Sequence, residues 1–300
     1  MISGYYNQIK NELLNNEVYK RVKDYSKNRN ELSTYYNVGK LLIEAGKQYG
    51  EKIIGNYSEK LVVEVGKKYN KRTLFRMRQF YKLIEEQKVS TVSTQLSWSH
   101  YCELLSIKDI DEINYYIITT ERYNLSVREL RERIKNKEYQ RLDDNTKLKL
   151  INKKELYISD TIKNPIIIKN KLEIDKENVS EKMLQKIILE DIEGFMRELG
   201  DSFSFIGSEY KIKINNAYNY IDLLLFNIKY NCYVVVELKV TEVKKEHIGQ
   251  IEVYMNYIDK HVKNITNDRT IGIIVARRDN HYYIEYSSDK RIYTRDYELV

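Results

Sequence analysis

The sequence predicts an α + α/β protein, with a helical N-terminal domain that contains a helix-turn-helix-like unit and a C-terminal mixed sheet flanked by helices. From Ile9 to about Leu142, apolar residues recur at the three- and four-residue spacing of helices. From Val179 onward, helical stretches alternate with apolar runs of strand length. The 300 residues are 42% hydrophobic, which is sufficient for two domains with separate cores. We expect a helical domain, a linker with a short strand and a second domain at residues 1–145, 146–178 and 179–300.

The composition argues against several classes of protein. A single proline and 11 glycines exclude a collagen-like architecture. The longest apolar runs, such as residues 221–226, are far too short to cross a membrane, and the N-terminus lacks the pattern of a secretory signal. Cys102 and Cys232 cannot form a disulfide framework and lack the spacing of metal ligands. We therefore expect a cytoplasmic protein with no membrane partner.

Positive charge is concentrated in the N-terminal half. Residues 1–150 contain 28 Lys and Arg against 20 Asp and Glu, whereas residues 151–300 contain 23 against 24. The densest stretch, Lys60–Lys82, has Glu64 as its one acid. A basic stretch of this kind favours an anionic partner, and we expect that partner to be DNA. The alternative is an ordinary solvated face of a helical domain.

The same stretch has the pattern of two helices joined by a short turn. Leu61–Val65 belongs to one apolar stripe and Leu74 begins the next, with Asn70 as a suitable N-cap between them. Helix-turn-helix readers of DNA have this arrangement, although the same motif also occurs as a mere packing unit. The side chains that we expect to contact DNA are Lys71, Arg72, Arg76, Arg78 and Gln79.

Other signals lie between this motif and the second domain. Trp98 and His100 suggest either a site or a role in the core and in capping a helix, and the pattern favours the second. Ser126 and Glu129 have the spacing of a capping box at the start of a helix. Residues 166–168 are expected to form the short strand of the linker.

The second domain is predicted to consist of a helix, three strands, a helix and two further strands. Glu181–Leu199 has an amphipathic helical pattern that stops at Gly200. A second helix is expected at Glu246–Val262. The expected strands are Phe203–Ile214, Tyr218–Phe226, Cys232–Val240, Ile271–Ala276 and Tyr282–Ser287.

Two apolar strands of this domain contain charged residues. Asp222 interrupts one strand, and Glu237 and Lys239 interrupt the next. A buried charge is costly unless it is paired or bound to a metal. If the strands form a hairpin that turns near residues 227–231, Asp222 lies directly across from Glu237, with β-carbons about 5 Å apart. Lys239 then leaves the same face, because side chains alternate along a strand.

Two carboxylates and a lysine on one face can support metal-assisted hydrolysis. Carboxylates this close repel each other unless a cation lies between them, and oxygen ligands without histidine or cysteine favour Mg²⁺ or Mn²⁺. We expect Asp222 and Glu237 to bind the metal and Lys239 to orient a water that attacks a phosphodiester bond. Gln250, one turn before Tyr254 on the following helix, is expected to support the site. The alternative is a structural network of buried charges.

These residues resemble the PD-(D/E)XK nuclease signature, and nearly the whole chain resembles the YhcG family. The strings that carry the resemblance are Tyr220-Ile-Asp-Leu-Leu-Leu-Phe, Val235-Val-Glu-Leu-Lys, Gly249-Gln250, Ile271-Gly-Ile-Ile, Met77-Arg-Gln-Phe-Tyr, Leu96-Ser-Trp-Ser-His-Tyr and Ser126-Val-Arg-Glu-Leu. The resemblance implies a restriction-endonuclease-like fold in the second domain. It also implies a metal-dependent DNA endonuclease that acts in a mobile-element or defence context.

The chain departs from that family at the first helix of the second domain. Where the family places a glutamate that can bind the metal, this chain has Gln185, whose amide oxygen is a weaker ligand. Glu181, one turn earlier, lies on the same helix face and is the acid best placed to replace it. The alternative is that Gln185 is an ordinary polar residue near a helix start.

The leading hypothesis from the sequence is a Mg²⁺-dependent deoxyribonuclease whose helical half binds DNA. One alternative is a nucleic-acid-binding adaptor that keeps the nuclease fold without cleaving. Another is a structural partner in a larger defence or recombination complex. Metal-dependent cleavage separates the first hypothesis from the other two, and DNA retention without cleavage separates the adaptor from the structural partner. A homodimer is left open.

Overall fold

The computed structural model describes residues 4–21, 27–86, 95–278 and 289–300. The chain divides into two compact units, Met1–Tyr139 and Gln140–Val300. The first unit is helical and the second contains a sheet with helices, so the α + α/β fold class is confirmed. None of the described helices combines the length and the apolar character needed to cross a bilayer.

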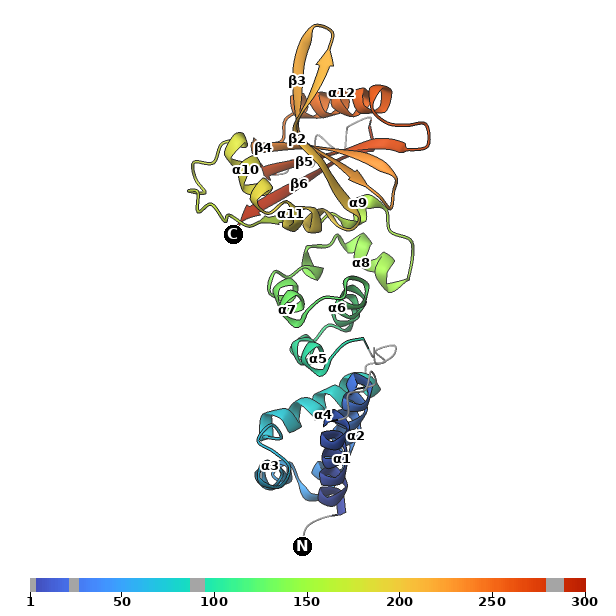
Figure 1. Cartoon of the computed structure of the whole chain (residues 1–300), viewed down its shortest axis with the longest axis vertical. Helices are drawn as coiled ribbons and strands as arrows, with labels where there is room; N and C mark the ends of the chain where they lie inside the picture. The colour runs from blue at the N-terminus through green and yellow to red at the C-terminus, as the bar shows by residue number, and fades with distance from the viewer. Residues whose placement is uncertain (1–3, 22–26, 87–94, 279–288) are drawn as a thin grey trace. The chain divides into compact units, whose positions relative to one another are not determined.

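Helices form the first unit (Figure 1). They are α1 (Gly4–Arg21), α2 (Lys27–Tyr49), α3 (Ile53–Glu64), α4 (Lys71–Glu86), α5 (Trp98–Leu104), α6 (Ile110–Tyr123) and α7 (Val127–Lys135). Buried apolar side chains of α1 to α4, among them Ile9, Leu42 and Leu74, form one core cluster. Gly39 lets α2 approach α4 closely, since a β-carbon at this position would lie 2.2 Å from the Met77 carbonyl oxygen.

The expected pair of helices around a basic turn is present as α3 and α4, joined by residues 65–70. The Asn70 side chain caps α4 by accepting a hydrogen bond of 3.1 Å from the Thr73 amide. Met77 is fully buried, whereas Arg72 on the opposite side of α4 is exposed. The helix pair therefore has one packed face and one polar face, and its contact with DNA stays a prediction.

Trp98 and His100 have the structural roles that the sequence favours. The Trp98 ring packs edge-on against Tyr35, with 4.7 Å between ring centroids. His100 caps its own helix, because its Nδ1 accepts a hydrogen bond of 3.0 Å from the backbone amide of the N-cap residue. The capping box is also confirmed, since the Ser126 amide donates to Glu129 Oε2 at 2.8 Å.

Six strands of described residues form one mixed sheet in the second unit (Figure 1). In the order in which they lie side by side, they are β1 (Ile166–Ile168), β6 (Ile292–Leu299), β5 (Asp268–Arg278), β4 (Cys232–Glu242), β3 (Ala217–Asn227) and β2 (Phe203–Ile214). The strands β1, β6, β5 and β4 are parallel to one another, whereas β3 is antiparallel to both of its neighbours. The helices are α8 (Asp144–Ile151), α9 (Ile158–Thr161), α10 (Glu181–Glu190), α11 (Ile192–Leu199) and α12 (Lys245–His261), and the short helix η1 (Tyr139–Arg141) begins at the last residue of the first unit.

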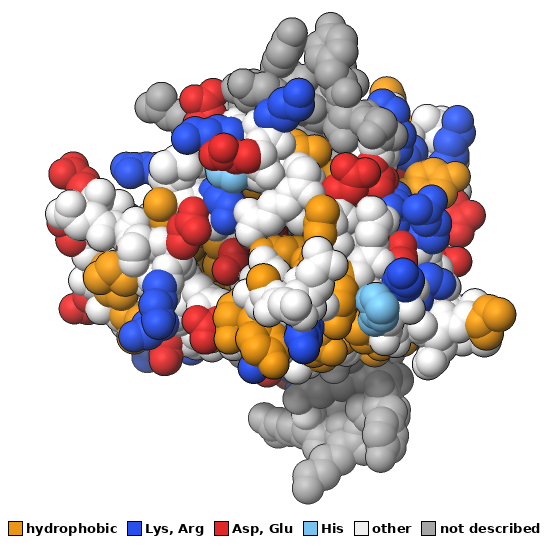
Figure 2. Space-filling view, turned by 90° about the horizontal axis from the view of Figure 1, so that it is seen from above, with side chains coloured by type: hydrophobic (Ala, Val, Ile, Leu, Met, Phe, Trp, Pro, Cys, Tyr) orange, Lys and Arg blue, Asp and Glu red, His pale blue; other side chains and the backbone are white. Residues whose placement is uncertain are grey.

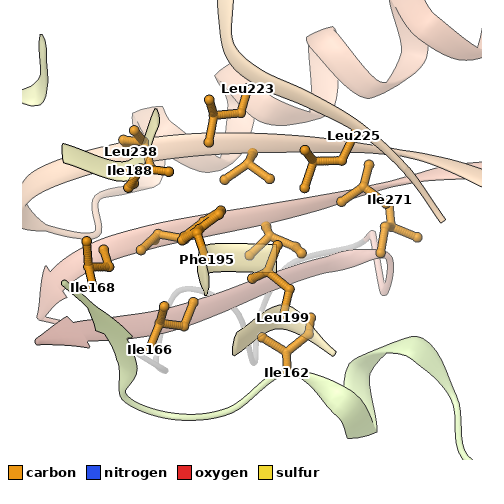
Figure 3. Close-up of a cluster of buried hydrophobic side chains, with 14 of the residues drawn as sticks. Ile162, Ile166, Ile168, Ile188, Phe195, Leu199, Leu223, Leu225, Leu238 and Ile271 are labelled. Carbon is orange, nitrogen blue, oxygen red and sulfur yellow. The ribbon is translucent and has the colours of Figure 1, made fainter. Parts of the chain in front are cut away.

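Helices cover both faces of this sheet. On one face, α10 and α11 pack over a core cluster that includes Phe195, Leu223 and Leu238 (Figure 3). On the other face, α12 packs over a cluster that includes Leu224 and Val235. The central strand β4 is thus covered on both sides, which is why its sequence is a nearly continuous apolar run. Any charge on β4 must therefore be paired or satisfied in another way.

The segment expected to be a linker belongs to the second unit. This unit begins at Gln140, and residues 146–178 contain most of α8 together with α9 and β1. Ile158, Ile162 and Ile166 are buried in the core cluster of Figure 3. Apolar residues so widely spaced give no periodic signal, so the sequence alone could not reveal that they pack against a distant sheet.

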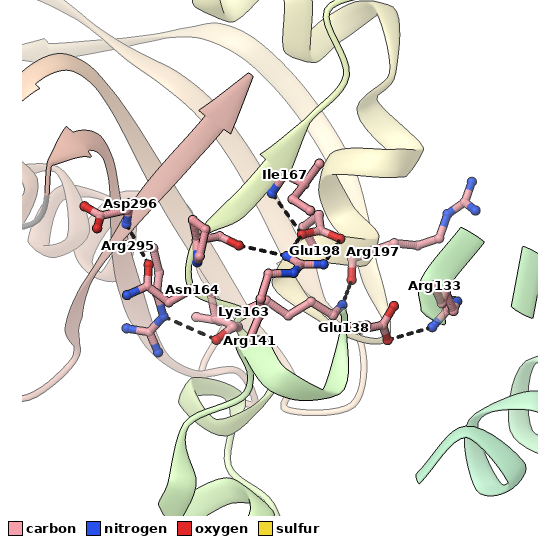
Figure 4. A network of polar contacts seen from close by, with 12 residues as sticks. Arg133, Glu138, Arg141, Lys163, Asn164, Ile167, Arg197, Glu198, Arg295 and Asp296 are labelled. Carbon is pink, nitrogen blue, oxygen red and sulfur yellow. Dashed lines mark hydrogen bonds and ion pairs between the residues drawn. The ribbon is translucent and has the colours of Figure 1, made fainter. Parts of the chain in front are cut away.

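A buried polar network fixes the same segment to α11 and β6 (Figure 4). Arg141 is ion-paired with Glu198, and their side chains are 8% and 12% exposed. The Arg141 guanidinium also donates to the Pro165 carbonyl at 2.7 Å, and Glu198 accepts a hydrogen bond of 2.9 Å from the Ile167 amide. These bonds satisfy backbone groups that an exposed linker would leave to water.

Other elements also differ from the expectation. The single helix expected at Glu181–Leu199 is divided into α10 and α11, because Asp191 leaves the helical conformation with φ −138° and ψ 50°. The strand expected at Tyr282–Ser287 lies outside the described residues. The strand β6 was not expected, since tyrosine, threonine, arginine and aspartate interrupt its apolar pattern.

Candidate active site

The hairpin of β3 and β4 brings the predicted charged residues together. Leu223 pairs with Val236, so the next residues along the two strands are Asp222 and Glu237. The Leu238 amide donates a hydrogen bond of 2.8 Å to Asp222 Oδ2, which connects the two strands at this point. The register of the pairs from Leu223 to Asn227 is therefore as predicted, and the same register continued by one residue places Asp222 opposite Glu237.

The two carboxyl groups strongly affect each other's protonation. Glu237 is 2% exposed, and burial together with repulsion from Asp222 raises the pKa of Glu237 to about 8, even though Lys239 lowers it. Burial also raises the pKa of Asp222, against the opposing effects of the Leu238 amide and Lys239. Near neutral pH the pair therefore retains a proton that two isolated carboxylates would release.

Lys239 is held between acidic side chains. Its Nζ lies 3.4 Å from Glu237 Oε2 and 3.5 Å from Glu181 Oε2, and the residue is 7% exposed. Burial alone lowers the pKa of Lys239, but attraction to Glu237, Glu181 and Asp222 outweighs this effect and raises the pKa. Lys239 therefore stays a positively charged ammonium group in a fixed position beside the carboxylates.

The helix α10 faces this cluster through Gln185 and Glu181. The Gln185 side-chain amide donates a hydrogen bond of 2.8 Å to the Asp222 carbonyl oxygen, and the residue is 7% exposed. Because Nε2 makes this bond, Oε1 is the atom of Gln185 that remains to accept another contact. Glu181 reaches Lys239 from one turn earlier. The role of each residue as a metal ligand stays a prediction.

Gln250 lies on α12, where its Nε2 donates a hydrogen bond of 3.0 Å to the Tyr254 hydroxyl. The expected spacing of one helical turn thus brings these two side chains together, as predicted. This bond orients Gln250 without connecting it to Asp222 or Glu237, so its supporting role stays a prediction.

Two further side chains that lie near the cluster were not predicted from the sequence. His247 on α12 has a side chain that is 11% exposed, and burial followed by the charge of Lys239 lowers its pKa. Glu209 on β2 raises the pKa of Asp222 and has a left-handed φ of 47°. His247 could not have been identified from a local signal, because its position depends on how α12 packs. Glu209 lies between the paired residues Ser208 and Tyr210, opposite Asp222, so the register of the β2–β3 hairpin could have identified it.

The carboxylate pair fits a hard divalent cation. Glu237 Oε1 is buried and has no hydrogen-bond partner among the described residues, which is the state that a bound cation would relieve. The described part of the chain contains no group of three or more His, Cys, Asp or Glu side chains arranged for a metal. Mg²⁺, however, is commonly bound through one or two carboxylates with water at the other positions. Asp222 and Glu237 are the residues that could hold it.

The predicted DNA contacts of the first unit are not equivalent. The exposed ones are Lys71, Arg72 and Gln79. Arg76 is half-buried. The Arg78 side chain is only 12% exposed, and its two terminal nitrogens donate to the Glu51 carboxylate at 2.5 and 2.9 Å. The two terminal nitrogens of Arg78 are thus already occupied by Glu51, whereas the guanidinium of Arg72 is exposed.

Comparison with known proteins finds family models in both units. Residues 159–299 match a YhcG PDDEXK nuclease domain, and residues 14–141 match a DUF1016 N-terminal domain. The chain is also 26% identical over 286 residues to the "Putative nuclease YhcG" of Escherichia coli (strain K12), which covers 81% of this chain and 76% of that protein. The nuclease-domain match agrees with the restriction-endonuclease-like class expected for the mixed sheet.

Two solved structures are also similar to this chain, each at 18% identity. One is a repair endonuclease from Pyrococcus abyssi, with a TM-score of 0.29 over 40% of this chain. The other is an EndoMS–dsDNA2 complex, with a TM-score of 0.30 over 41% of this chain. The chain spans about half the length of each, 47% and 48% respectively.

Proposed function

We propose that this chain, which matches a DUF1016 N-terminal domain followed by a YhcG PDDEXK nuclease domain, is a DNA endonuclease that uses Mg²⁺ or Mn²⁺. The observation that carries the proposal is the cross-strand pair of Asp222 and Glu237, with a buried carboxylate oxygen that lacks a partner among the described residues. In a purely structural ion network, that oxygen would have a hydrogen-bond or ion-pair partner in the protein. In a catalytic site, the oxygen is available to bind a metal ion.

Each residue of the site is proposed to have a different role in hydrolysis. Asp222 and Glu237 would hold the metal, which when bound supplies Lewis-acid activation of water and neutralises charge on the phosphate. Lys239, fixed by Glu237 and Glu181, would orient the attacking water and stabilise negative charge that develops on the phosphate oxygens. Gln185 holds the backbone of Asp222 and so positions the first of the two carboxylates.

A cleavage panel tests this function. The purified chain is incubated with supercoiled plasmid and with labelled oligonucleotides, in Mg²⁺, in Mn²⁺ and in EDTA. We expect cleavage with either metal and none with EDTA. If DNA is bound but stays intact under all three conditions, the chain is the non-catalytic adaptor instead. The replacement of the expected helix acid by Gln185 is the observation that keeps the adaptor as the second candidate.

The first unit is proposed to supply most of the affinity for DNA. Acidic and basic side chains are interspersed on the face of the second unit in Figure 2. Residues 151–300 carry 23 basic against 24 acidic residues, so this half has no excess of positive charge. The basic side chains of α4 are therefore the better candidates for phosphate contacts.

We expect the double substitution Arg72→Glu and Arg76→Glu to weaken DNA binding by at least about tenfold. The salt dependence of binding should also decrease, because each lost phosphate contact reduces counterion release by about one ion. Binding of a labelled duplex is measured across a salt series in EDTA. Lys47→Glu with Lys108→Glu is the matched control, since both lysines are exposed in the same unit outside α4. Equal losses in the two double variants would remove the case for DNA binding by α4.

Gln185→Ala is expected to weaken Mg²⁺ binding less than Asp222→Ala, since two carboxylates completed by water can still hold the ion. Gln185→Glu is expected to tighten Mg²⁺ binding because it adds a negative charge. The same change should destabilise the metal-free protein, since a carboxylate cannot donate to the Asp222 carbonyl. Mg²⁺ titrations followed by calorimetry measure the affinity. An unchanged Mg²⁺ affinity for Gln185→Glu would show that this position does not face the metal.

A further inference from the structure

The outer half of the β2–β3 hairpin has two different faces. The hairpin projects from the sheet beside α12 (Figure 1). On one face, Ile212 and Ile221 are buried in the core cluster that includes residues of α12. On the other face, the side chains point to solvent, and Tyr218 and Tyr220 are 57% and 52% exposed. The residues of this exposed face are Lys211, Lys213, Tyr218 and Tyr220.

These four side chains form two cross-strand pairs, and we call them the Lys/Tyr face. Lys211 lies opposite Tyr220, and Lys213 lies opposite Tyr218, so both side chains of each pair leave the same side of the hairpin. The ammonium groups of Lys211 and Lys213 lie 3.8 and 5.9 Å from the centroid of the Tyr218 ring. Positive charge and aromatic rings are therefore combined on one exposed surface.

The position and charge of the Lys/Tyr face suit a nucleic acid strand. Tyr220 stands two residues before Asp222 on β3, a distance of about 7 Å along an extended strand. Residues 210–221 contain two lysines and no acid, and the nearest acids on the hairpin are Glu209 and Asp222, which lie at the active-site end of the Lys/Tyr face. Lysine with exposed aromatic rings is the combination that binds phosphates and stacks on bases in single strands.

We propose that the Lys/Tyr face binds an unpaired stretch of the DNA strand that enters the active site, so that the substrate is DNA with a single-stranded segment. This inference rests on the proposed function. In a duplex, successive bases of a strand are stacked about 3.4 Å apart and cover one another's faces. The two pairs of the Lys/Tyr face are about 7 Å apart along the hairpin. That spacing fits the separated bases of an extended strand, with the two lysines moving from the ring to the phosphates.

Binding measurements on the full chain in EDTA test the inference without cleavage. The probes are a single-stranded oligonucleotide, a blunt duplex and the same duplex with a single-stranded tail. We expect Tyr218→Val with Tyr220→Val to weaken binding of the single-stranded and tailed probes by roughly tenfold or more, about 1.4 kcal/mol. Binding of the blunt duplex should change little. Valine keeps the preference for a strand while removing the flat ring.

The matched control is Tyr218→Phe with Tyr220→Phe, which keeps both rings and should bind like the wild type. A fluorescent 2-aminopurine base in the tail supplies a second measurement, because its emission changes when an aromatic ring stacks on it. We expect that change in the wild type and the phenylalanine variant but not in the valine variant. Wild-type affinity of the valine variant for the tailed probe would overturn the inference, as would equal losses for the tailed and blunt probes.

The inference and the proposed function fail in different ways. If the wild type cuts DNA in Mg²⁺ but the valine variant binds every probe normally, the nuclease assignment stands and the Lys/Tyr face is not a strand-binding surface. If no DNA is cut but the valine variant loses the tailed probe, the face binds unpaired DNA in a protein that does not cleave it.

Discussion

Replacing Glu237 or Lys239 with alanine is expected to abolish metal-dependent DNA cleavage. Glu237 supplies the buried oxygen without a partner among the described residues, and Lys239 is the cation fixed beside it. Loss of one group that stabilises charge in a transition state typically lowers the rate by about 10²- to 10³-fold. Loss of a metal ligand also lowers the fraction of protein molecules that hold the ion, and molecules without the ion do not cleave DNA. Single-turnover cleavage of a labelled oligonucleotide in saturating Mg²⁺ measures the loss.

The folded state of each variant must be checked separately. Lys239→Ala leaves two buried carboxyl groups without their cation, so it should lower stability in EDTA more than in Mg²⁺. Glu237→Gln keeps the shape of the side chain and serves as the conservative variant. Glu242→Ala on the same strand is the matched control, since Glu242 is exposed and should not affect cleavage. Cleavage at the wild-type rate by a well-folded Glu237→Ala, Lys239→Ala double variant would refute the assignment of the site.

The charged residues on apolar strands could be located from the sequence because the necessary information is local. Side chains alternate along a strand, and a short turn sets which residues of a hairpin are opposite each other. The apolar residues on either side of Asp222 and Glu237 predict buried strands, so charged residues within those strands can be recognised in the sequence. The same local rules predict the bounds of β2 at Phe203 and Ile214 without error.

The parts that the sequence could not predict depend on contacts between distant segments. His247 approaches Lys239 only because α12 packs beside the strands. Likewise, the sequence grouped Arg78 with Arg72 as an expected DNA contact, because nothing local shows that Glu51 lies beside Arg78 in the fold. In each case the side chain is polar and the local pattern permits exposure, so a partner from elsewhere in the chain decides its environment.

The pKa of Glu237 predicts a pH-dependent stability of the metal-free protein. In the unfolded chain this carboxyl has an ordinary pKa near 4.5, whereas burial and Asp222 raise it to about 8 in the folded state. Below pH 4.5 both states hold the proton and the group has no effect. As pH rises toward 8, the unfolded state releases the proton and the folded state does not, so stability falls by up to about 1.36 kcal/mol per pH unit. Above pH 8 the full penalty, about 3 to 5 kcal/mol, remains.

Glu237→Gln should therefore stabilise the metal-free protein at pH 8 and have little effect at pH 4.5, because glutamine cannot ionise. Denaturant unfolding of the second unit in EDTA, followed across this pH range for both proteins, measures the difference and cancels the contributions of titrating groups that do not interact with Glu237. Added Mg²⁺ should restore stability to the wild type at pH 8, since the ion replaces the proton between Asp222 and Glu237, and should do so much less for the variant. If the difference in free energy of unfolding between the two proteins is constant from pH 4.5 to 8, Glu237 ionises with an ordinary pKa. The site would then lack the repulsion between buried carboxyl groups that a cation relieves, and the proposed function depends on that repulsion.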